Sequence, residues 1–374
     1  MSRTRYAVVG AGLAGSATAW QLARRGADVV LLEAFQVGHA RGSSHGSARI
    51  IRRAYADRFH AALTGEAWRD WGELEADSGE QFVTRTGGLD FGHSRDVPAI
   101  ARAQAAEGVP HTLLSAAEAQ ERWPQFHFDT DVLHHPDAGV VDADLAVRTA
   151  ARRAVELGAD LRTDWPVAAV QRTAGHYVLS SAAGHPPVEA DVVVVAAGPW
   201  LPELLGGLPI DTQAFPRFEV TQQQVFHFRS RTHAAWPVFV HKDVLSVYGL
   251  PGGRDVGAGA IKVAEHDHGR VTTASTRDGR VDGASRARLV NYVGRYLPGL
   301  DPEPSAEATC LYTSTPSETF LIDRVDGLVV VSPCSGHGAK FAPTVGRIAA
   351  DLASGARSAT LDPFSLRAHA AARV

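Results

Sequence analysis

The fold is decided by residues 5–33, RYAVVGAGLAGSATAWQLARRGADVVLLE, near the start of the chain. A short apolar run at 6–9 is typical of a buried parallel strand, and a glycine-rich loop at 10–15 follows it directly. Apolar positions then recur at helical spacing over 16–25, and a second apolar run at 28–33 ends in an acid. This order of strand, glycine loop, helix, strand and acid predicts a dinucleotide-binding βαβ unit.

Each glycine of this loop has a predicted purpose. Gly10 makes the tight turn, Gly12 lets the backbone approach a pyrophosphate, and Gly15 lets the helix pack close to the strand. The positions that follow Gly12, Leu13 and Ala14, are expected to bind the cofactor, because a helix N-terminus offers free N–H groups and partial positive charge to phosphates.

The acid at Glu33 ends the second strand of the unit. A carboxylate there accepts hydrogen bonds from ribose hydroxyls and argues against a 2′-phosphate, which an arginine would bind. It does not distinguish NAD from FAD. The alternative for the whole unit is a glycine-rich turn that binds no ligand, and the flanking strands and the acid disfavour it.

The length, net charge and cysteine number limit the class of protein to which this chain can belong. At 374 residues the chain exceeds the usual size of one domain, so two domains are expected. A net charge of −4 gives no reason to expect nucleic acid or an anionic membrane as a partner. No segment approaches the roughly 18 apolar residues of a membrane helix, and the first strand starts too early for a signal peptide. With only two cysteines, we expect a cytoplasmic protein without a disulfide framework, and we expect no metal site.

Two later segments repeat the pattern of a strand followed by small residues. A run of valines within 189–198 ends in Ala197 and Gly198, and the apolar run 327–332 leads into a glycine-rich loop at 333–340 and then a helix. Open α/β sheets bind ligands at the carboxyl ends of their strands, so all three strand ends are expected to meet on one long ligand. A closing loop of this kind is more typical of a flavoprotein than of a nicotinamide enzyme.

Other segments predict a second kind of structure. The segment 48–55, ARIIRRAY, contains three arginines, which usually mark a solvated helix face; the alternative is an anion site. Residues 82–91 resemble a strand, a turn and a second strand. Between residues 215 and 300, short runs of alternating character predict an antiparallel sheet.

Four motifs make a family resemblance specific: GAGLAG at 10–15, GSSHGSARIIRRAY at 42–55, CLYT at 310–313 and SGHGAK at 335–340. Together they resemble the monomeric sarcosine oxidase and N-methyltryptophan oxidase family, among the FAD oxidoreductases that are similar to D-amino-acid oxidase. The similarity runs from residue 6 to about residue 352. It implies FAD bound by the βαβ unit.

The expected architecture is therefore α/β, with a Rossmann-like FAD-binding domain interleaved with an α+β substrate domain built on an antiparallel sheet. The expected ranges are 1–80, 142–212 and 311–374 for the FAD-binding domain, and 81–141 and 213–310 for the substrate and catalytic domain.

The resemblance also implies residues beside the flavin. Cys310 matches a cysteine that is bonded to the flavin 8α-methyl group; the alternative is an inert buried thiol. Arg49 and His45 match positions near the ring, where positive charge stabilises the reduced flavin. Lys262 matches a lysine that speeds the reaction of the flavin with oxygen; the alternative is an edge or surface lysine. The other expected cofactor-binding residues are Gly10, Gly12, Leu13, Ala14, Gly15, Glu33, Ser43, Ser44, Val167, Ala197, Gly198, Trp200, Gly336, Gly338 and Lys340.

For the substrate, the resemblance implies that Arg52 and Lys340 anchor a carboxylate, which an arginine fork and a second cation hold well. Tyr248 and His266 match residues that line the substrate pocket, and Tyr312 matches a further active-site tyrosine.

The implied reaction oxidises the C–N bond of a secondary or tertiary amino acid, of the sarcosine or cyclic kind, to an imine that is hydrolysed, while O2 becomes H2O2. The substrate itself stays open, because Ser44 replaces a second histidine of the family and Cys334 replaces a bulky apolar residue. The alternatives are a biosynthetic tailoring enzyme for a specialised amine, an amine dehydrogenase with another electron acceptor, and a non-catalytic nucleotide-binding module. A monomer is expected.

Overall fold

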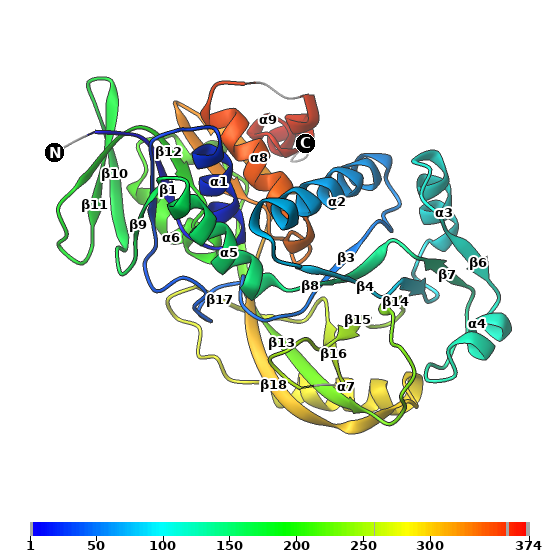
Figure 1. Ribbon diagram of the computed structural model, residues 1–374. Helices are drawn as coiled ribbons and strands as arrows, with labels where there is room; N and C mark the ends of the chain where they lie inside the picture. The colour runs from blue at the N-terminus through cyan, green and yellow to red at the C-terminus, as the bar shows by residue number, and fades with distance from the viewer. Residues whose placement is uncertain (1–2, 258, 357–358, 372–374) are drawn as a thin grey trace.

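The computed structural model describes residues 3–257, 259–356 and 359–371. Within these residues the strands form three sheets (Figure 1). The first contains the predicted βαβ unit, the second is the antiparallel sheet, and a small third sheet lies between them. The structure therefore confirms the mixed α/β class, and none of its helices within the described ranges combines the length and apolar character needed to cross a membrane.

The first sheet is centred on β1, which pairs in parallel with β2 on one side and with β12 on the other. Its order is β10-β11-β12-β1-β2-β9, with β20 beside β12 and β19 beside β20. The valine run forms β12 and lies beside β1, which brings the carboxyl ends of these two predicted strands together. The strands are β1 (Thr4–Val9), β2 (Val29–Leu32), β9 (Asp160–Arg162), β10 (Val167–Thr173), β11 (His176–Ser181), β12 (Val188–Val195), β19 (Leu321–Val325) and β20 (Leu328–Ser332).

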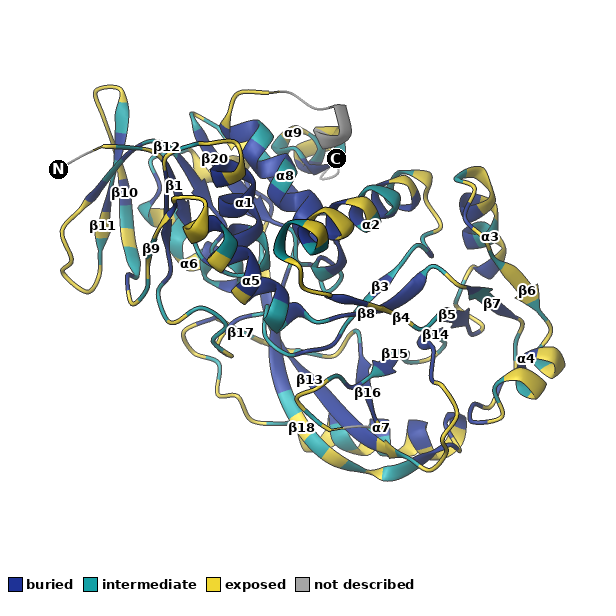
Figure 2. Ribbon diagram, viewed as in Figure 1, coloured by how far each residue is buried: buried dark blue, intermediate teal, exposed yellow. Residues whose placement is uncertain are grey.

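Helices cover this sheet because its central strands are apolar on both faces. Figure 2 shows α1 and α8 largely buried, whereas the β10–β11 ribbon exposes much of its surface. The large side chains Trp20, Trp71 and Phe341 fill the core beneath them. The helices of this part are α1 (Leu13–Arg24), α2 (Arg58–Ser78), α5 (Ala143–Glu156), α6 (Leu201–Leu204), α8 (Ala342–Ala353) and α9 (Leu366–Ala371), with short 3-10 turns η1 (Gly198–Trp200), η2 (Leu205–Gly207), η3 (Thr212–Ala214), η4 (Ala339–Phe341) and η5 (Ala359–Phe364).

The second sheet has the order β17-β13-β16-β15-β14-β5-β7-β6, with β18 beside β13. Its neighbours are antiparallel except for β5 and β14, which run parallel. Helix α7 packs on it over an aromatic core that includes Phe226, Phe228 and Phe239. The elements are β5 (Gly88–Phe91), β6 (Thr112–Leu114), β7 (Val132–His135), β13 (Glu219–Ser230), β14 (Val238–Lys242), β15 (Ser246–Pro251), β16 (Ala260–Glu265), β17 (Arg270–Thr272), β18 (Leu300–Ser314), α3 (Val97–Ala106), α4 (Ala116–Arg122) and α7 (Gly283–Tyr296).

The third sheet corrects two expectations. It consists of β3 (Arg49–Arg52), β8 (Ala138–Val141) and β4 (Val83–Arg85) in the order β3-β8-β4. The three arginines are therefore not a helix face: Arg49 and Arg52 lie in β3 and Arg53 follows it, and Ile51 is fully buried in the hydrophobic core of the first sheet and its helices. The two strands within 82–91 also do not pair with each other, since β4 joins this sheet and β5 joins the second one.

Strand β18 was not anticipated. It runs from Leu300 to Ser314 beside β13, so the expected domain boundary between residues 310 and 311 falls within one continuous strand. Its two prolines are tolerated because a strand at the edge of a sheet leaves half of its N–H groups unpaired. The domain ranges otherwise stay a prediction.

Candidate active site

A cavity of about 630 Å³ begins at the glycine loop after β1 and extends to the face of the second sheet formed by β14, β15 and β16. It brings most of the predicted site residues together. Those on its wall are Gly10, Gly12, Leu13, Ala14, Glu33, Ser43, Ser44, Arg49, Arg52, Val167, Ala197, Gly198, Trp200, Tyr248, Lys262, His266, Cys310, Tyr312, Gly336, Gly338 and Lys340. Gly15 and His45 lie outside this wall.

The glycine loop is shaped by close backbone contacts. Gly10 has a φ of +96°, and a Cβ there would lie 2.5 Å from the Ala196 carbonyl oxygen. A Cβ at Gly15 would lie 1.7 Å from the carbonyl oxygen of Gly10, so α1 packs directly on the turn. Gly15 therefore acts behind the cavity, as predicted for helix–strand packing, and Leu13 and Ala14 at the start of α1 lie on the cavity wall.

The segment between β2 and β3 closes over the start of α1. Ser44 Oγ accepts a hydrogen bond of 3.1 Å from the Leu13 amide, and Ser43 Oγ donates one of 2.6 Å to the Leu311 carbonyl on β18. A Cβ at Gly12 would lie 2.9 Å from Ser44 Oγ. Gly12 thus makes room for this segment, which joins the helix to the second sheet.

Glu33 has more partners than the sequence indicated. Its carboxylate accepts hydrogen bonds from the amides of Ala11 at 2.7 Å and Phe35 at 3.0 Å, and His39 Nε2 lies 3.3 Å away. Burial alone would raise the pKa of Glu33, but the hydrogen bonds from His39 and Ala11 outweigh it and lower the pKa. The carboxylate therefore stays ionised at the place where a ribose is expected.

Three residues that were expected beside a flavin meet at the other end of the cavity. Cys310 is buried on β18, and Lys262 is buried on β16, where its ammonium donates to the Ala48 carbonyl at 3.3 Å. The edge or surface alternative for Lys262 is wrong. Burial, followed by the charge of Arg49, lowers the pKa of Lys262 to about 7. Arg49 itself donates to the carbonyls of Ala48, Ser43 and His45, which fixes its guanidinium.

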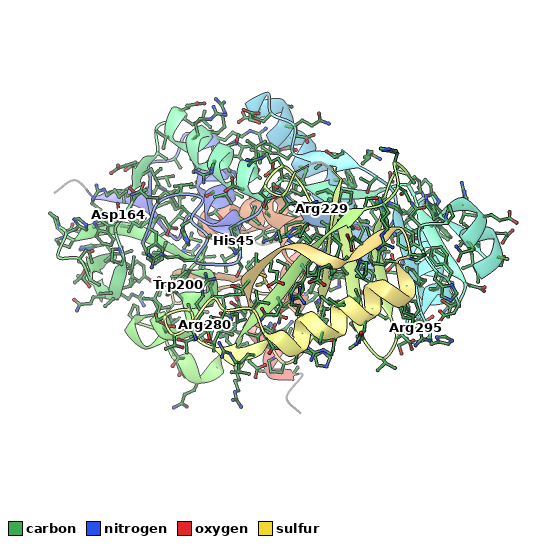
Figure 3. All side chains as sticks on the ribbon, turned by 90° about the horizontal axis from the view of Figure 1, so that it is seen from below. His45, Asp164, Trp200, Arg229, Arg280 and Arg295 are labelled. Carbon is green, nitrogen blue, oxygen red and sulfur yellow. The ribbon has the colours of Figure 1, made fainter. Side chains whose placement is uncertain are left out.

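His45 differs from the expectation of positive charge near the ring. It lies near the middle of the molecule (Figure 3), and its Nε2 has no hydrogen-bond partner among the described residues. Burial, with the charges of Arg49 and Lys262, lowers the pKa of His45 to about 4. The imidazole is therefore neutral near pH 7, and Arg49 supplies the charge at this place.

The predicted carboxylate anchor is held by a tyrosine. Lys340 Nζ donates to Tyr55 Oη at 3.0 Å and to the His337 carbonyl at 2.6 Å. The guanidinium of Arg52 lies 5.2 Å from the centre of the Tyr55 ring. Burial, followed by the charge of Arg52, lowers the pKa of Lys340, and burial raises the pKa of Tyr55 to about 12.

A buried acid lies behind this anchor. Asp90 accepts two hydrogen bonds from Arg95, at 2.8 and 2.5 Å, and it lies 3.7 Å from Arg52 and 2.9 Å from His135 Nε2. Although burial alone would raise the pKa of Asp90, the charges of Arg95 and Arg52 lower it well below its usual value. Asp90 thus orients two arginines whose other sides border the cavity.

Two aromatic hydroxyls form another part of the cavity wall. Tyr248 Oη and Tyr312 Oη lie 3.3 Å apart, and burial raises the pKa of both hydroxyls. A Cβ at Gly336 would lie 2.6 Å from the Tyr312 ring and 2.7 Å from the His266 ring, so the glycine-rich loop packs on this wall. His266 is 3.8 Å from Glu318 at the exposed edge of the cavity.

Sequence reasoning missed several residues of the wall and its support: Tyr55, Asp90, Arg95, Lys242, Glu318 and His337. Tyr55 and His337 stood inside the motifs that carried the resemblance, so the motifs contained a signal for them. Asp90, Arg95 and Lys242 come from strands and loops of the second sheet, and Glu318 comes from the loop between β18 and β19. No local pattern marks these four residues. Possible metal ligands at His266, Asp267 and Glu318 lie within 4.8 Å of one another, but both carboxylates are exposed.

The residues present fit FAD. Helix-terminal amides and an ionised acid lie at one end of the cavity, and a thiol, a lysine and an arginine lie at the other, with one continuous wall between them. Phosphates suit the first end, and a redox-active ring beside fixed positive charge suits the second. The neighbouring Arg52 and Lys340 can bind a small carboxylate against that ring.

Comparison with known proteins agrees with this geometry. The sequence model of a family described as FAD dependent oxidoreductase matches residues 5–352. The chain is 32% identical to human peroxisomal sarcosine oxidase over 363 residues. This alignment covers 92% of this chain and 90% of that protein. It is 33% identical over 363 residues to a monomeric sarcosine oxidase of Streptomyces avermitilis, with 92% of each chain covered.

Among solved structures, the fold matches NikD, which is described as an unusual amino acid oxidase essential for nikkomycin biosynthesis. The TM-score is 0.85 over 98% of both chains, at 24% sequence identity. At this identity the likeness shows the fold alone.

Proposed function

Because this chain belongs to the FAD-dependent oxidoreductase family, we propose that it is a flavin-dependent oxidase of the C–N bond in secondary or tertiary amino acids. Its proposed substrates are N-methyl amino acids of the sarcosine kind or cyclic amino acids. The observation that carries the proposal is the cavity, which joins the dinucleotide loop at Gly10 to two cations, Arg52 and Lys340.

Arg52 and Lys340 are proposed to hold the substrate carboxylate. Both face the cavity, and hydrogen bonds between charged partners are stronger than neutral ones. Tyr55 orients the Lys340 ammonium, and the Lys340 carbonyl accepts a hydrogen bond of 2.7 Å from Trp71 Nε1, which fixes the backbone. A carboxylate bound here leaves the amine beside the tyrosine pair.

The amine must be neutral to be oxidised. Positive charge at Arg49, Arg52 and Lys340 disfavours a substrate ammonium and so lowers its pKa. Tyr248 and Tyr312, whose hydroxyls stay protonated, can orient the amine by hydrogen bonds. FAD held between the glycine loop at Gly10 and the buried Cys310 and Lys262 would supply the two-electron oxidation of the C–N bond, with O2 as the proposed final acceptor and H2O2 as its product. The imine product is then hydrolysed.

The function is tested by adding amines to the purified holoenzyme without oxygen. Sarcosine, N-methyl-L-tryptophan, L-pipecolate and L-proline are the test compounds, and loss of the flavin's visible absorbance is the readout. At least one of them is expected to bleach the flavin. If none does, the proposed substrate class is wrong, and a tailoring enzyme for another amine or a non-catalytic nucleotide-binding module replaces it.

The electron acceptor needs a separate test. Lys262 supports O2, because it is a buried cation on the cavity wall whose charge favours electron transfer to oxygen. One mole of peroxide for each mole of amine oxidised is expected in air. Amine oxidation that requires an artificial acceptor and yields no peroxide would instead identify an amine dehydrogenase.

Covalent attachment of FAD through Cys310 is also proposed. The thiol is buried, lies on the cavity wall and occupies the flavin end. Acid precipitation of the protein is expected to leave yellow colour in the pellet, and Cys310→Ser is expected to release it into the supernatant. Cys334→Ser is the matched control, because the Cys334 thiol also lines the cavity. This variant is expected to leave the colour in the pellet. Colour in the wild-type supernatant would overturn the linkage.

We propose that the enzyme is a cytoplasmic monomer. Both cysteines are free thiols, which suits a reducing compartment, and two relatives of this chain are described as monomeric sarcosine oxidases. Size-exclusion chromatography with light scattering, giving the mass of one chain, is the check.

A further inference from the structure

The chain contains three lysines, and all three line the cavity. Lysine and arginine together number 37 residues, so the great majority of these cations are arginines. Lysine differs from arginine in carrying a compact ammonium whose pKa shifts readily on burial. Lys262 and Lys340 already have proposed roles, whereas nothing above explains why a lysine stands at Lys242.

Lys242 faces the cavity because of the alternation of β14. Val240 and Lys242 lie on the cavity wall, while Phe239 packs into the aromatic core on the other side of the sheet. Strand β14 runs parallel to β5 with Val240 opposite Asp90. Lys242 is two residues after Val240 on β14. Its side chain therefore lies on the same face of the sheet as Asp90, beside the substrate anchor.

The Lys242 ammonium has no hydrogen bond or ion pair within the described part of the chain. The charges that act on it are those of Arg95, Arg52, Glu318 and Asp267. Burial, followed by the positive charges of Arg95 and Arg52, lowers the pKa of Lys242. A half-buried cation without a partner is costly, and an anionic ligand would remove that cost.

Cations outnumber acids at this end of the cavity. The cations are Arg52, Arg95, Lys242 and Lys340, and the acids are the buried Asp90 and the exposed Asp267 and Glu318. Asp90 is paired with Arg95 and Arg52, whereas Asp267 and Glu318 lie beside His266 and form no ion pair with Lys242. The Lys242 ammonium therefore stays available to an anionic group of a ligand.

We propose that Lys242 binds a second carboxylate of the substrate and thereby selects N-alkyl amino acids that carry an acidic side chain. The proposal rests on the proposed amine oxidation at the same site. Arg52 and Lys340 hold the α-carboxylate, and Lys242 holds the side-chain carboxylate with the charge of Arg95 nearby. Lys242 is then the residue that determines specificity.

Binding of compounds that cannot be oxidised tests this directly. Malonate, succinate and glutarate are titrated into the holoenzyme by calorimetry, each against its half-amide, which keeps the shape and one carboxylate. At least one dicarboxylate is expected to bind about tenfold more tightly than its half-amide, the gain of one charge-assisted contact. Lys242→Met is expected to reduce this ratio to about one, and Lys242→Arg is expected to restore most of it.

Two results would overturn the assignment. Either the wild-type enzyme binds no dicarboxylate more tightly than the corresponding half-amide, or Lys242→Met keeps the preference for the dicarboxylate. A second measurement separates this failure from failure of the proposed function. N-methyl-L-aspartate is expected to reduce the flavin with a higher kcat/KM than N-methyl-L-asparagine. If both reduce it equally, only the role of Lys242 is wrong; if no amine of any kind reduces it, the amine oxidation itself is wrong.

Discussion

The pKa of Lys262 leads to a quantitative prediction about reoxidation by O2. Burial and the charge of Arg49 lower this pKa to about 7, against the opposing effects of Cys310 and Asp255. At that value about 90% of the Lys262 side chains are protonated near pH 6 and about 10% near pH 8. Because the charged form is the one that favours electron transfer to oxygen, the rate constant for reoxidation should fall about tenfold between these two pH values.

The measurement is stopped-flow mixing of reduced holoenzyme with oxygenated buffer at a series of pH values. Lys262→Met keeps the length of the side chain without its charge, so its rate constant should be low and independent of pH. The rate of flavin reduction by the amine without oxygen is the control and should change little in this variant. Negative charge on a nearby reduced flavin raises the pKa of Lys262 and moves the fall to higher pH, so the series extends to about pH 10.

The reasoning is refuted if the wild-type rate constant stays flat over the whole range. It is equally refuted if Lys262→Met shows the same fall, because the titrating group would then be another one.

Three further substitutions have expected outcomes. Arg52→Met removes charge-assisted contacts worth about 1.5–3 kcal/mol, so KM for a carboxylate-bearing amine should rise about 10- to 100-fold in steady-state assays, with a smaller change in kcat. Asp90→Asn leaves buried arginines without their counter-charge and should lower the free energy of unfolding by about 3–5 kcal/mol in urea titrations, whereas Asp301→Asn in an exposed ion pair should leave the midpoint unchanged. Gly338→Ala places a Cβ 1.5 Å from the Pro333 carbonyl oxygen and should cost about 1–3 kcal/mol, seen as a lower Tm; an unchanged Tm would show that the loop relaxes freely.

The βαβ unit of the first sheet was predictable because its signals are local. Gly10 needs a positive φ, Gly15 needs to contact the turn, and the acid at Glu33 ends the strand, all within one stretch of about 30 residues. The start of α5 has a similarly local cause, since the Asp142 side chain caps this helix by accepting a hydrogen bond from the Leu145 amide.

The second and third sheets were less predictable because their strands are defined by distant partners. Strand β18 contains prolines and acids rather than an apolar run, and only its pairing with β13 makes it a strand. Strand β3 was hidden for a similar reason: Arg49 and Arg52 flank Ile51, and only the third sheet and the cavity account for burying that segment.

The active site divides in the same way. Residues inside the motifs, such as Arg52, Cys310 and Lys340, could be named from the sequence and do meet at one cavity. Asp90 and Lys242 could not, because their proximity depends on the parallel pairing of β5 with β14, which joins residues about 150 positions apart. The neutral state of His45 also depends on burial, which no local pattern reveals.

The placement of every lysine on the cavity wall has a practical consequence for chemical labelling. Reagents that acylate or reductively alkylate amines find no lysine ammonium on the outer surface, since Lys262 and Lys340 are buried and Lys242 points inward. A reagent that immobilises or cross-links the protein through lysine would therefore have to enter the cavity. Conversely, acylation of Lys242, read by peptide mass spectrometry with and without a ligand, becomes a footprint of cavity occupancy that needs no engineered probe.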